Sequence, residues 1–348
     1  MKPKSDIRAE AERLRGFFEA KGATHFETEV LQPAGALLDL YGEDIRARAF
    51  VTHDPLRGEM MLRPDFTVPL VQRHMAEGRA AARYTYAGEV FRRQEDDETR
   101  PTEYTQVGYE TFGDTDAARA EADAFATIAE ALGGLDVRPV IGDIGIARAA
   151  IAELSTNDRR KAALLRHLNQ PVRFKALLNR FSSEQPKPPV FDDSIPLVGL
   201  RSRQDIETRL AVLAEEAHSA PLDAAEIARL NGILAVNGHA IEAVGHLSDL
   251  AANNVAINAA VARLESRLAA IAAVGINADT LRFEASYRRT SLEYYTGFVF
   301  GFTAASGPPV ATGGRFDSLT AALGDGPLPA VGGVIRADGV HALREGRA

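Results

Sequence analysis

A polar face on one half of a predicted hairpin carries the side chains best suited to bind a ligand. Residues 83–94 and 103–112 have the pattern of two neighbouring strands. Because side chains alternate between the faces of a strand, Gln106, Gly108 and Glu110 share one face of the second strand with Tyr104 and Phe112. Gly108 removes bulk between Gln106 and Glu110, so a ligand could lie against the backbone while both side chains reach it.

The first strand of this hairpin contributes Arg92, which shares a face with Tyr86, Gly88 and Val90. Arg92 could therefore project over the same cavity. The pattern leaves two interpretations open. One is a ligand pocket, and the other is an open sheet face turned to solvent, where glutamine, glutamate and arginine are ordinary residues.

The elements that position this hairpin alternate between strands and helices. Strands are predicted at 46–53, 59–63, 83–94, 103–112 and 136–142, and helices at 66–79 and 116–132. Strand patterns return at 281–286 and 295–304, followed by a glycine pair and a short C-terminal helix. We expect an α+β fold in which residues 1–145 and 276–348 form a mainly antiparallel sheet flanked by helices. Residues 146–275, interrupted by a proline-rich connection at 186–189, should form a mostly helical insertion.

The composition of the 348 residues is that of a soluble globular protein, with 45% hydrophobic and 25% charged residues. There is no cysteine, which excludes disulfides, thiolate nucleophiles and zinc–thiolate sites. The eight histidines include no pair at i, i+4, so we predict no metal site. The N-terminus lacks the apolar run of a signal peptide, and no stretch approaches the ~20 apolar residues of a membrane span. We expect a cytoplasmic protein that does not contact a membrane.

The net charge of −8 argues against nucleic acid as a partner, because such binding depends on clustered Lys and Arg that neutralise phosphates. The densest basic group comprises Arg159, Arg160, Lys161 and Arg166. At helical spacing this group is more typical of a solvated helix face than of an RNA-binding surface.

Five segments resemble, in the correct order, segments of histidyl-tRNA synthetase. They are LQPAGALLDLYGE from Leu31, LRPDFT from Leu62, FRRQ from Phe91 with its continuation TQVGYETFG from Thr105, RTSLEYYTGF from Arg289, and GGRFDSL from Gly313. The resemblance covers most of residues 1–150 and 280–336. It implies a class II aminoacyl-tRNA synthetase-like core, in which Pro33 lies at a dimer interface.

Carried over position by position, this resemblance implies a pocket for free L-histidine. Asp65, Thr67 and Gln106 would receive the α-amino group, and Arg92 would face the carboxylate. Glu110, with Tyr294 or Tyr295, would hold the imidazole. A carboxylate accepts strong charge-assisted bonds from an ammonium group, and a second carboxylate selects a ring N–H that most amino acids lack.

The departures from the synthetase pattern indicate that adenylation has been lost. Thr290 stands where that family places its catalytic arginine, and Gly339 stands where motif 3 keeps an arginine against ATP. Arg336 lies three places earlier and could take that position only through a shifted alignment, which would require a deletion. The loop EDDETRP from Glu95 places four acidic residues where phosphates would approach. The chain ends almost directly after motif 3, so we expect no anticodon-binding domain. Loss of one preorganised charge typically lowers a rate ~100- to 1,000-fold.

This combination resembles the regulatory subunits of ATP phosphoribosyltransferase. The resemblance implies a protein with no catalytic residues, cofactor or activity of its own, which activates a short-form catalytic subunit and conveys histidine feedback inhibition as an allosteric regulator in histidine biosynthesis. It also implies a homodimer within a hetero-octamer of four regulatory and four catalytic chains. Two alternatives are a degenerate ligase that adenylates histidine and transfers it to an acceptor other than tRNA, and an assembly scaffold with a vestigial pocket.

Overall fold

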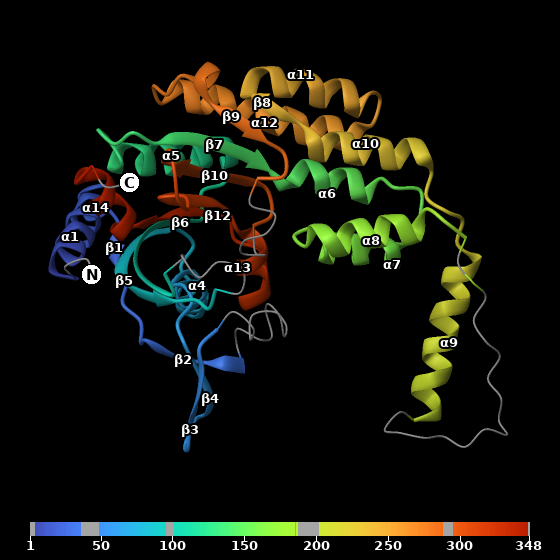
Figure 1. Ribbon diagram of the computed structural model, residues 1–348, viewed down its shortest axis with the longest axis horizontal. Helices are drawn as coiled ribbons and strands as arrows, with labels where there is room; N and C mark the ends of the chain where they lie inside the picture. Colours follow the sequence, from blue (N-terminus) through green and yellow to red (C-terminus); the bar gives the residue numbers. More distant parts are fainter. Residues whose placement is uncertain are drawn as a thin grey trace.

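The computed structural model describes residues 4–35, 49–94, 101–184, 186, 202–287 and 295–346. Within these residues the main element is a nine-stranded sheet (Figure 1). Its strands, in spatial order, are β1 (Thr24–His25), β5 (Ala82–Phe91), β6 (Glu103–Phe112), β12 (Ala330–Arg336), β11 (Ala311–Arg315), β10 (Phe298–Thr303), β7 (Arg138–Asp143), β9 (Arg282–Glu284) and β8 (Asn237–His239). Only the β1–β5 and β7–β9 pairs of this sheet are parallel, which confirms the predicted mainly antiparallel fold.

A second, smaller sheet lies in the chain between β1 and β5 of the main sheet. It has the order β2 (Leu31–Pro33), β4 (Gly58–Leu62) and β3 (Val51–Asp54). The turn between β3 and β4 is set by Asp54, whose carboxylate accepts the backbone N–H groups of Leu56 and Arg57 at 2.8 and 3.0 Å. Gly58 then adopts a φ of 81°, a conformation that favours glycine.

Helices cover both faces of the main sheet. One face packs against α1 (Lys4–Ala20), α5 (Ala117–Ala131) and α14 (Ala337–Arg344), where the rings of Phe18 and Tyr109 stack at 5.2 Å between centroids. The opposite face packs against α4 (Thr67–Glu77) and α13 (Asp317–Leu323), where His74 stacks on Phe112 at 4.2 Å. Because Tyr109 and Phe112 are three residues apart on β6, they point to opposite faces of the sheet.

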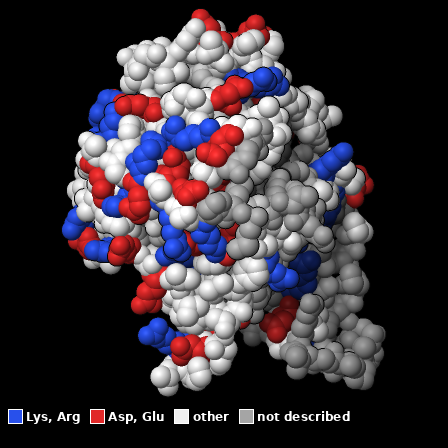
Figure 2. Space-filling view, turned by 60° about the vertical axis from the view of Figure 1, so that its left-hand side comes forward, with Lys and Arg blue, Asp and Glu red and all other residues white. Residues whose placement is uncertain are grey.

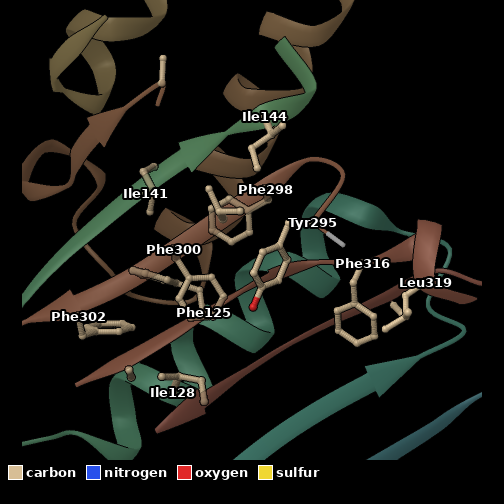
Figure 3. Close-up of a cluster of buried hydrophobic side chains, with 14 of the residues drawn as sticks. Phe125, Ile128, Ile141, Ile144, Tyr295, Phe298, Phe300, Phe302, Phe316 and Leu319 are labelled. Atoms are coloured by element: carbon tan, nitrogen blue, oxygen red, sulfur yellow. The ribbon is translucent and has the colours of Figure 1, made fainter. Parts of the chain in front are cut away.

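Aromatic packing joins α5 to β10 (Figure 3). Phe298, Phe300 and Phe302 alternate along β10 and so share one face, and their ring centroids lie 6.4, 5.4 and 5.2 Å from that of Phe125 on α5. All four side chains are buried. Aromatic side chains bury large apolar areas, so this cluster fixes α5 against the middle of the sheet.

The region between β7 and β9 is mostly helical. Its helices are α6 (Ile144–Ala152), α7 (Asp158–Arg166), α8 (Pro171–Phe181), α9 (Arg203–His218), α10 (Ala224–Ala235), α11 (Ala240–Ala251), α12 (Val255–Ala273) and the 3₁₀ helix η1 (Ala278–Thr280). In Figure 1, α7 to α9 lie to one side of the sheet, whereas α11 and α12 lie close to its β7–β9 end. The division into two domains at residues 145 and 276 stays a prediction.

A buried ion network ties α12 to the sheet. The Arg267 guanidinium on α12 donates to Glu121 on α5 and, at 2.7 Å, to Asp143 at the end of β7. Glu121 also receives Arg315 from β11, and Arg315 in turn pairs with Asp317 at 3.1 Å. The carboxylates of Glu121 and Asp143 balance the charge of Arg267, which is 4% exposed.

The basic group on α7 is not a uniform solvated face. Arg160 is fully buried and its Nε donates to Glu216 of α9 at 3.1 Å, while Arg159 pairs with Glu215 at 3.5 Å. This side of α7 therefore joins α9 through ion pairs. On the face that Figure 2 shows, Lys and Arg lie beside Asp and Glu and do not gather into a patch of one sign.

Candidate functional site

The pocket predicted on β6 centres on Glu110, which is 2% exposed. Two hydroxyl groups, those of Thr67 and Tyr86, donate to its Oε1 at 3.1 and 3.0 Å. Across the described residues its other oxygen, Oε2, is buried and has no hydrogen-bond partner. Glu110 thus presents one oxygen to the protein and keeps one for another donor.

Burial raises the pKa of Glu110 from its ordinary value of 4.5 to about 8. The Tyr86 and Thr67 hydroxyls favour the charged form and oppose this rise, whereas the nearby Asp65 carboxylate adds to it. At neutral pH the side chain therefore holds a proton for most of the time. A ligand N–H that bonds to the carboxylate would favour the charged form.

Tyr86 is a site residue that sequence reasoning missed. It is the cross-strand partner of Gly108, and its ring occupies the space above that glycine, where any side-chain carbon would overlap with it. The expectation that Gly108 leaves room for a ligand is therefore wrong, because the glycine accommodates Tyr86. The sequence already placed Tyr86 on the predicted face of Arg92. Only the register of β5 against β6 shows that its ring lies over Gly108.

The start of α4 brings two further predicted residues to the pocket. Thr67 is the first residue of the helix and, like Asp65, is 2% exposed. The Asp65 Oδ1 accepts the backbone N–H of Val68 at 3.3 Å, while Oδ2 is buried and has no partner among the described residues. Burial raises the pKa of Asp65, and the positive charge of Arg92 partly offsets that effect.

Arg92 and Gln106 complete this side of the pocket. The Nε of Arg92 donates to the Pro64 carbonyl at 2.7 Å, which holds the guanidinium beside Asp65. Gln106 is 2% exposed, and its Oε1 is buried without a partner in the part of the chain that the structure describes. Buried polar atoms are almost always paired, so Asp65 Oδ2, Gln106 Oε1 and Glu110 Oε2 are three acceptors that could receive N–H donors from a ligand.

Glycines on the central strands make room for the side chains of Glu110 and Tyr295. Gly332 on β12 is the register partner of both Glu110 and Gly314. A side-chain carbon at Gly332 would overlap with Glu110 Oε2, and one at Gly314 would lie 2.9 Å from Cδ1 of Tyr295. The Tyr295 ring and the Glu110 carboxylate thus lie over neighbouring strands on the same face. Tyr295, labelled in Figure 3, is 6% exposed.

Several predicted positions fall outside the described residues, namely Tyr294, Thr290 and the acidic loop at 95–98. Gly339 lies in α14, where a side-chain carbon would be 3.7 Å from Val310. Arg336, by contrast, is the register partner of Gln106 at the end of β12. The structure therefore adds Arg336 to the pocket face.

Sites of other kinds find no support in the described ranges. Within them, no cluster of three or more His, Asp or Glu side chains could hold a metal ion. The same ranges contain no helix with the length and apolarity needed to span a bilayer.

Comparison with solved structures identifies the fold. A Bacillus halodurans ATP phosphoribosyltransferase regulatory subunit/histidyl-tRNA synthetase matches 98% of this chain and 80% of its own, with a TM-score of 0.71 and 21% identity. A histidine–tRNA ligase subunit from Alicyclobacillus acidocaldarius matches 100% of this chain and 96% of its own, with a TM-score of 0.63 and 22% identity. The fold is that of a class II aminoacyl-tRNA synthetase core.

Sequence comparison identifies the family. The histidyl-tRNA synthetase family model matches residues 4–178 and 197–340. The ATP phosphoribosyltransferase regulatory subunit of Sinorhizobium fredii is 33% identical over 95% of each chain, and that of Mesorhizobium japonicum is 32% identical over 96% of this chain and 97% of its own. The chain belongs to the histidyl-tRNA synthetase family and, within it, to the ATP phosphoribosyltransferase regulatory subunits.

Proposed function

We propose that this chain binds the short-form catalytic subunit of ATP phosphoribosyltransferase, activates it, and conveys inhibition by L-histidine in the first step of histidine biosynthesis. The family gives the partner and the pathway. The observation that carries histidine as the ligand is the set of three buried acceptors without partners on one face of the pocket. The cytoplasm is the compartment that this role implies.

L-histidine matches the pocket group by group. Its imidazole N–H would bond to Glu110 Oε2, with Tyr295, whose ring lies over the neighbouring strand, against the imidazole. Its ammonium group would donate to Asp65 Oδ2 and Gln106 Oε1, and Arg92 would face its carboxylate. Thr67 would act through Glu110, to which it donates, and not by receiving the ammonium directly. Tyr294 stays a candidate for the imidazole end.

The strength of these contacts sets an upper limit on the affinity. A hydrogen bond to a charged group contributes ~1.5–3 kcal/mol, so three contribute ~4.5–9 kcal/mol before association costs are subtracted, against the ~8 kcal/mol of micromolar binding. Micromolar affinity therefore corresponds to the upper end of this range. To inhibit, histidine must bind one quaternary state better than another, since equal affinity for both shifts nothing.

A homodimer through the segment around Pro33 is part of this proposal. Val30 and Leu31 near Pro33 are 41% and 39% exposed, and Phe50 and Val51 at the opposite edge of the small sheet are 36% and 40% exposed. These exposed apolar side chains at the edges of the small sheet are ones that a second copy would cover. Two such dimers with four catalytic chains would form the hetero-octamer. A monomer in light scattering of the isolated chain would count against the dimer.

Absence of activity follows from the same interpretation. Thr290 and Gly339 carry no positive charge at the positions where the synthetase pattern places arginines. Because Arg92 is retained, the competing function is that of a ligase that transfers histidine to an acceptor other than tRNA. Histidine-dependent ATP–pyrophosphate exchange separates the two, because a regulatory subunit shows none.

The decisive experiment measures phosphoribosyl-ATP formation by the short catalytic subunit of the same genome, with and without this chain, while L-histidine is titrated. We expect stimulation that histidine reverses. Glu110→Ala should abolish the inhibition and retain assembly with the catalytic chain. Glu103→Ala is the matched control, because Glu103 is exposed at the start of the same strand and pairs only with Lys4 among the described residues. No effect of this chain on rate or inhibition would refute the proposal.

A further inference from the structure

We propose that Arg336 is a specificity-determining residue that binds the carboxylate of the amino acid in this pocket. The inference rests on the proposed function, since it assumes that L-histidine occupies the site. It concerns a residue at the end of β12 that pairing brings to the pocket from a distant part of the sequence. Arg336 is the cross-strand partner of Gln106, just as Gly332 is the partner of Glu110.

Strand alternation places Arg336 on the pocket face. Gly332, Val334 and Arg336 are two residues apart along β12 and pair with Glu110, Gly108 and Gln106 in turn. Partners in register share a face, so the side chain of Arg336 lies on the same face as those of Gln106 and Glu110. Glu110 and Arg336 therefore mark opposite ends of the pocket floor.

Two guanidinium groups converge on one tyrosine at the Arg336 end. The Cζ atom of Arg336 lies 4.4 Å from the ring centroid of Tyr104, and that of Arg92 lies 5.9 Å from the same centroid. Stacking on a ring restricts a guanidinium to one orientation. This end of the pocket thus carries two guanidinium groups, with Asp338 beside Arg336 and Asp65 near Arg92, whereas the floor beyond Gln106 ends at the Glu110 carboxyl group.

The donors of Arg336 are not all used. Its Nη2 donates to Asp338 at 3.1 Å, but within the described residues its buried Nε has no acceptor. A buried guanidinium N–H without an acceptor is costly, and a ligand oxyanion would satisfy it. Asp338 contacts one side of the guanidinium and leaves the Nε for such a ligand.

The chemistry of an α-amino acid selects a carboxylate over a phosphate as that oxyanion. The ammonium and carboxylate groups of an amino acid are attached to one carbon atom, so their binding groups must be neighbours. Gln106, whose free oxygen suits the ammonium, is the direct register partner of Arg336. Gln106 and Arg336 are therefore close enough to bind the ammonium and the carboxylate of the same amino acid.

Calorimetry of the full chain with L-histidine and L-histidinol tests the inference, because L-histidinol has a hydroxymethyl group in place of the carboxylate. We expect the wild type to prefer L-histidine at least tenfold. Arg336→Gln should weaken L-histidine at least tenfold and L-histidinol less than threefold. Arg344→Gln, which alters an arginine on α14 that pairs with Glu10 of α1, should leave both affinities unchanged.

Each other outcome has a defined meaning. Equal weakening of both ligands, or unchanged L-histidine binding, would show that Arg336 only supports the strand and would overturn the inference. Loss of ATP binding with L-histidine binding intact would assign Arg336 to a phosphate and overturn it as well. No binding of L-histidine by the wild type would instead refute the proposed function. If Arg336→Gln does not fold, Arg336→Lys decides, because a shorter reach should reduce the preference for L-histidine.

Discussion

Replacing Glu110 by glutamine should remove a pH-dependent loss of stability. The pKa of Glu110 is about 8 in the folded protein against an ordinary value of 4.5. Between these values the folded state binds a proton that the unfolded chain has released, so the free energy of unfolding falls as pH rises. At ~1.4 kcal/mol per pH unit, the full loss amounts to ~5 kcal/mol and is complete above the folded pKa.

The accessible part of this effect lies between pH 6 and pH 8. Over that interval the linkage relation gives a loss of ~2 kcal/mol from Glu110 alone. Glutamine has the same size and cannot ionise, and its amide oxygen can still accept the Thr67 and Tyr86 hydroxyls. Relative to the variant, the wild type should therefore lose ~2 kcal/mol of unfolding free energy between these pH values.

Urea denaturation of the wild type and Glu110→Gln at pH 6, 7 and 8 measures this difference. Glu103→Gln, exposed on the same strand, should follow the wild type at every pH. A constant difference between Glu110→Gln and the wild type would refute the reasoning, because it would mean that Glu110 does not titrate in this range. The variant should also bind L-histidine at least tenfold more weakly, since a neutral amide cannot supply a carboxylate.

Three further changes probe the rest of the molecule. Arg267→Met should cost ~3–5 kcal/mol of unfolding free energy in urea, because it leaves the buried Asp143 carboxylate without its cation and Glu121 with Arg315 alone; Arg263→Met, on the exposed side of the same helix, should change it by less than ~0.5 kcal/mol. In calorimetry, Gly332→Ala should weaken L-histidine at least tenfold by displacing the pocket carboxylate, whereas Gly245→Ala, in a helix with open space around it, should bind normally. Leu31→Asp should yield a monomer in light scattering. A variant that remains a dimer would show that the apolar residues around Pro33 do not form the dimer interface.

The sequence predicted the hairpin closely and two later strands poorly. The hairpin was expected at 83–94 and 103–112 and is observed at Ala82–Phe91 and Glu103–Phe112. β11 and β12 were not predicted, because each carries a glycine pair that lowers its strand propensity. These glycines have a tertiary reason, since the Tyr295 ring lies above Gly314 and the Glu110 carboxylate above Gly332, while the Phe300 ring lies against Gly313 and Gly333 on the opposite face.

The same limit applies to the site. Residue type and alternation placed Gln106 and Glu110 on one face, and the family resemblance added Asp65 and Thr67. The sequence pattern could not show how deeply these side chains are buried or which strands distant in the chain pair with each other. For that reason Tyr86 and Arg336 were missed as pocket residues, although both appear in the predicted segments. Their roles depend on register partners 22 and 230 positions away in the chain.

The Arg267 network limits how this protein can be taken apart. The Arg267 guanidinium on α12 pairs with two carboxylates that belong to the sheet side of the molecule, and one of these, Glu121, also pairs with Arg315 of β11. A shortened chain designed to keep only the sheet would retain both acids and lose their common cation. The helical region thus supplies a positive charge that buried carboxylates next to the sheet require. A partner that displaces α12 would therefore act directly on Asp143 at the end of β7.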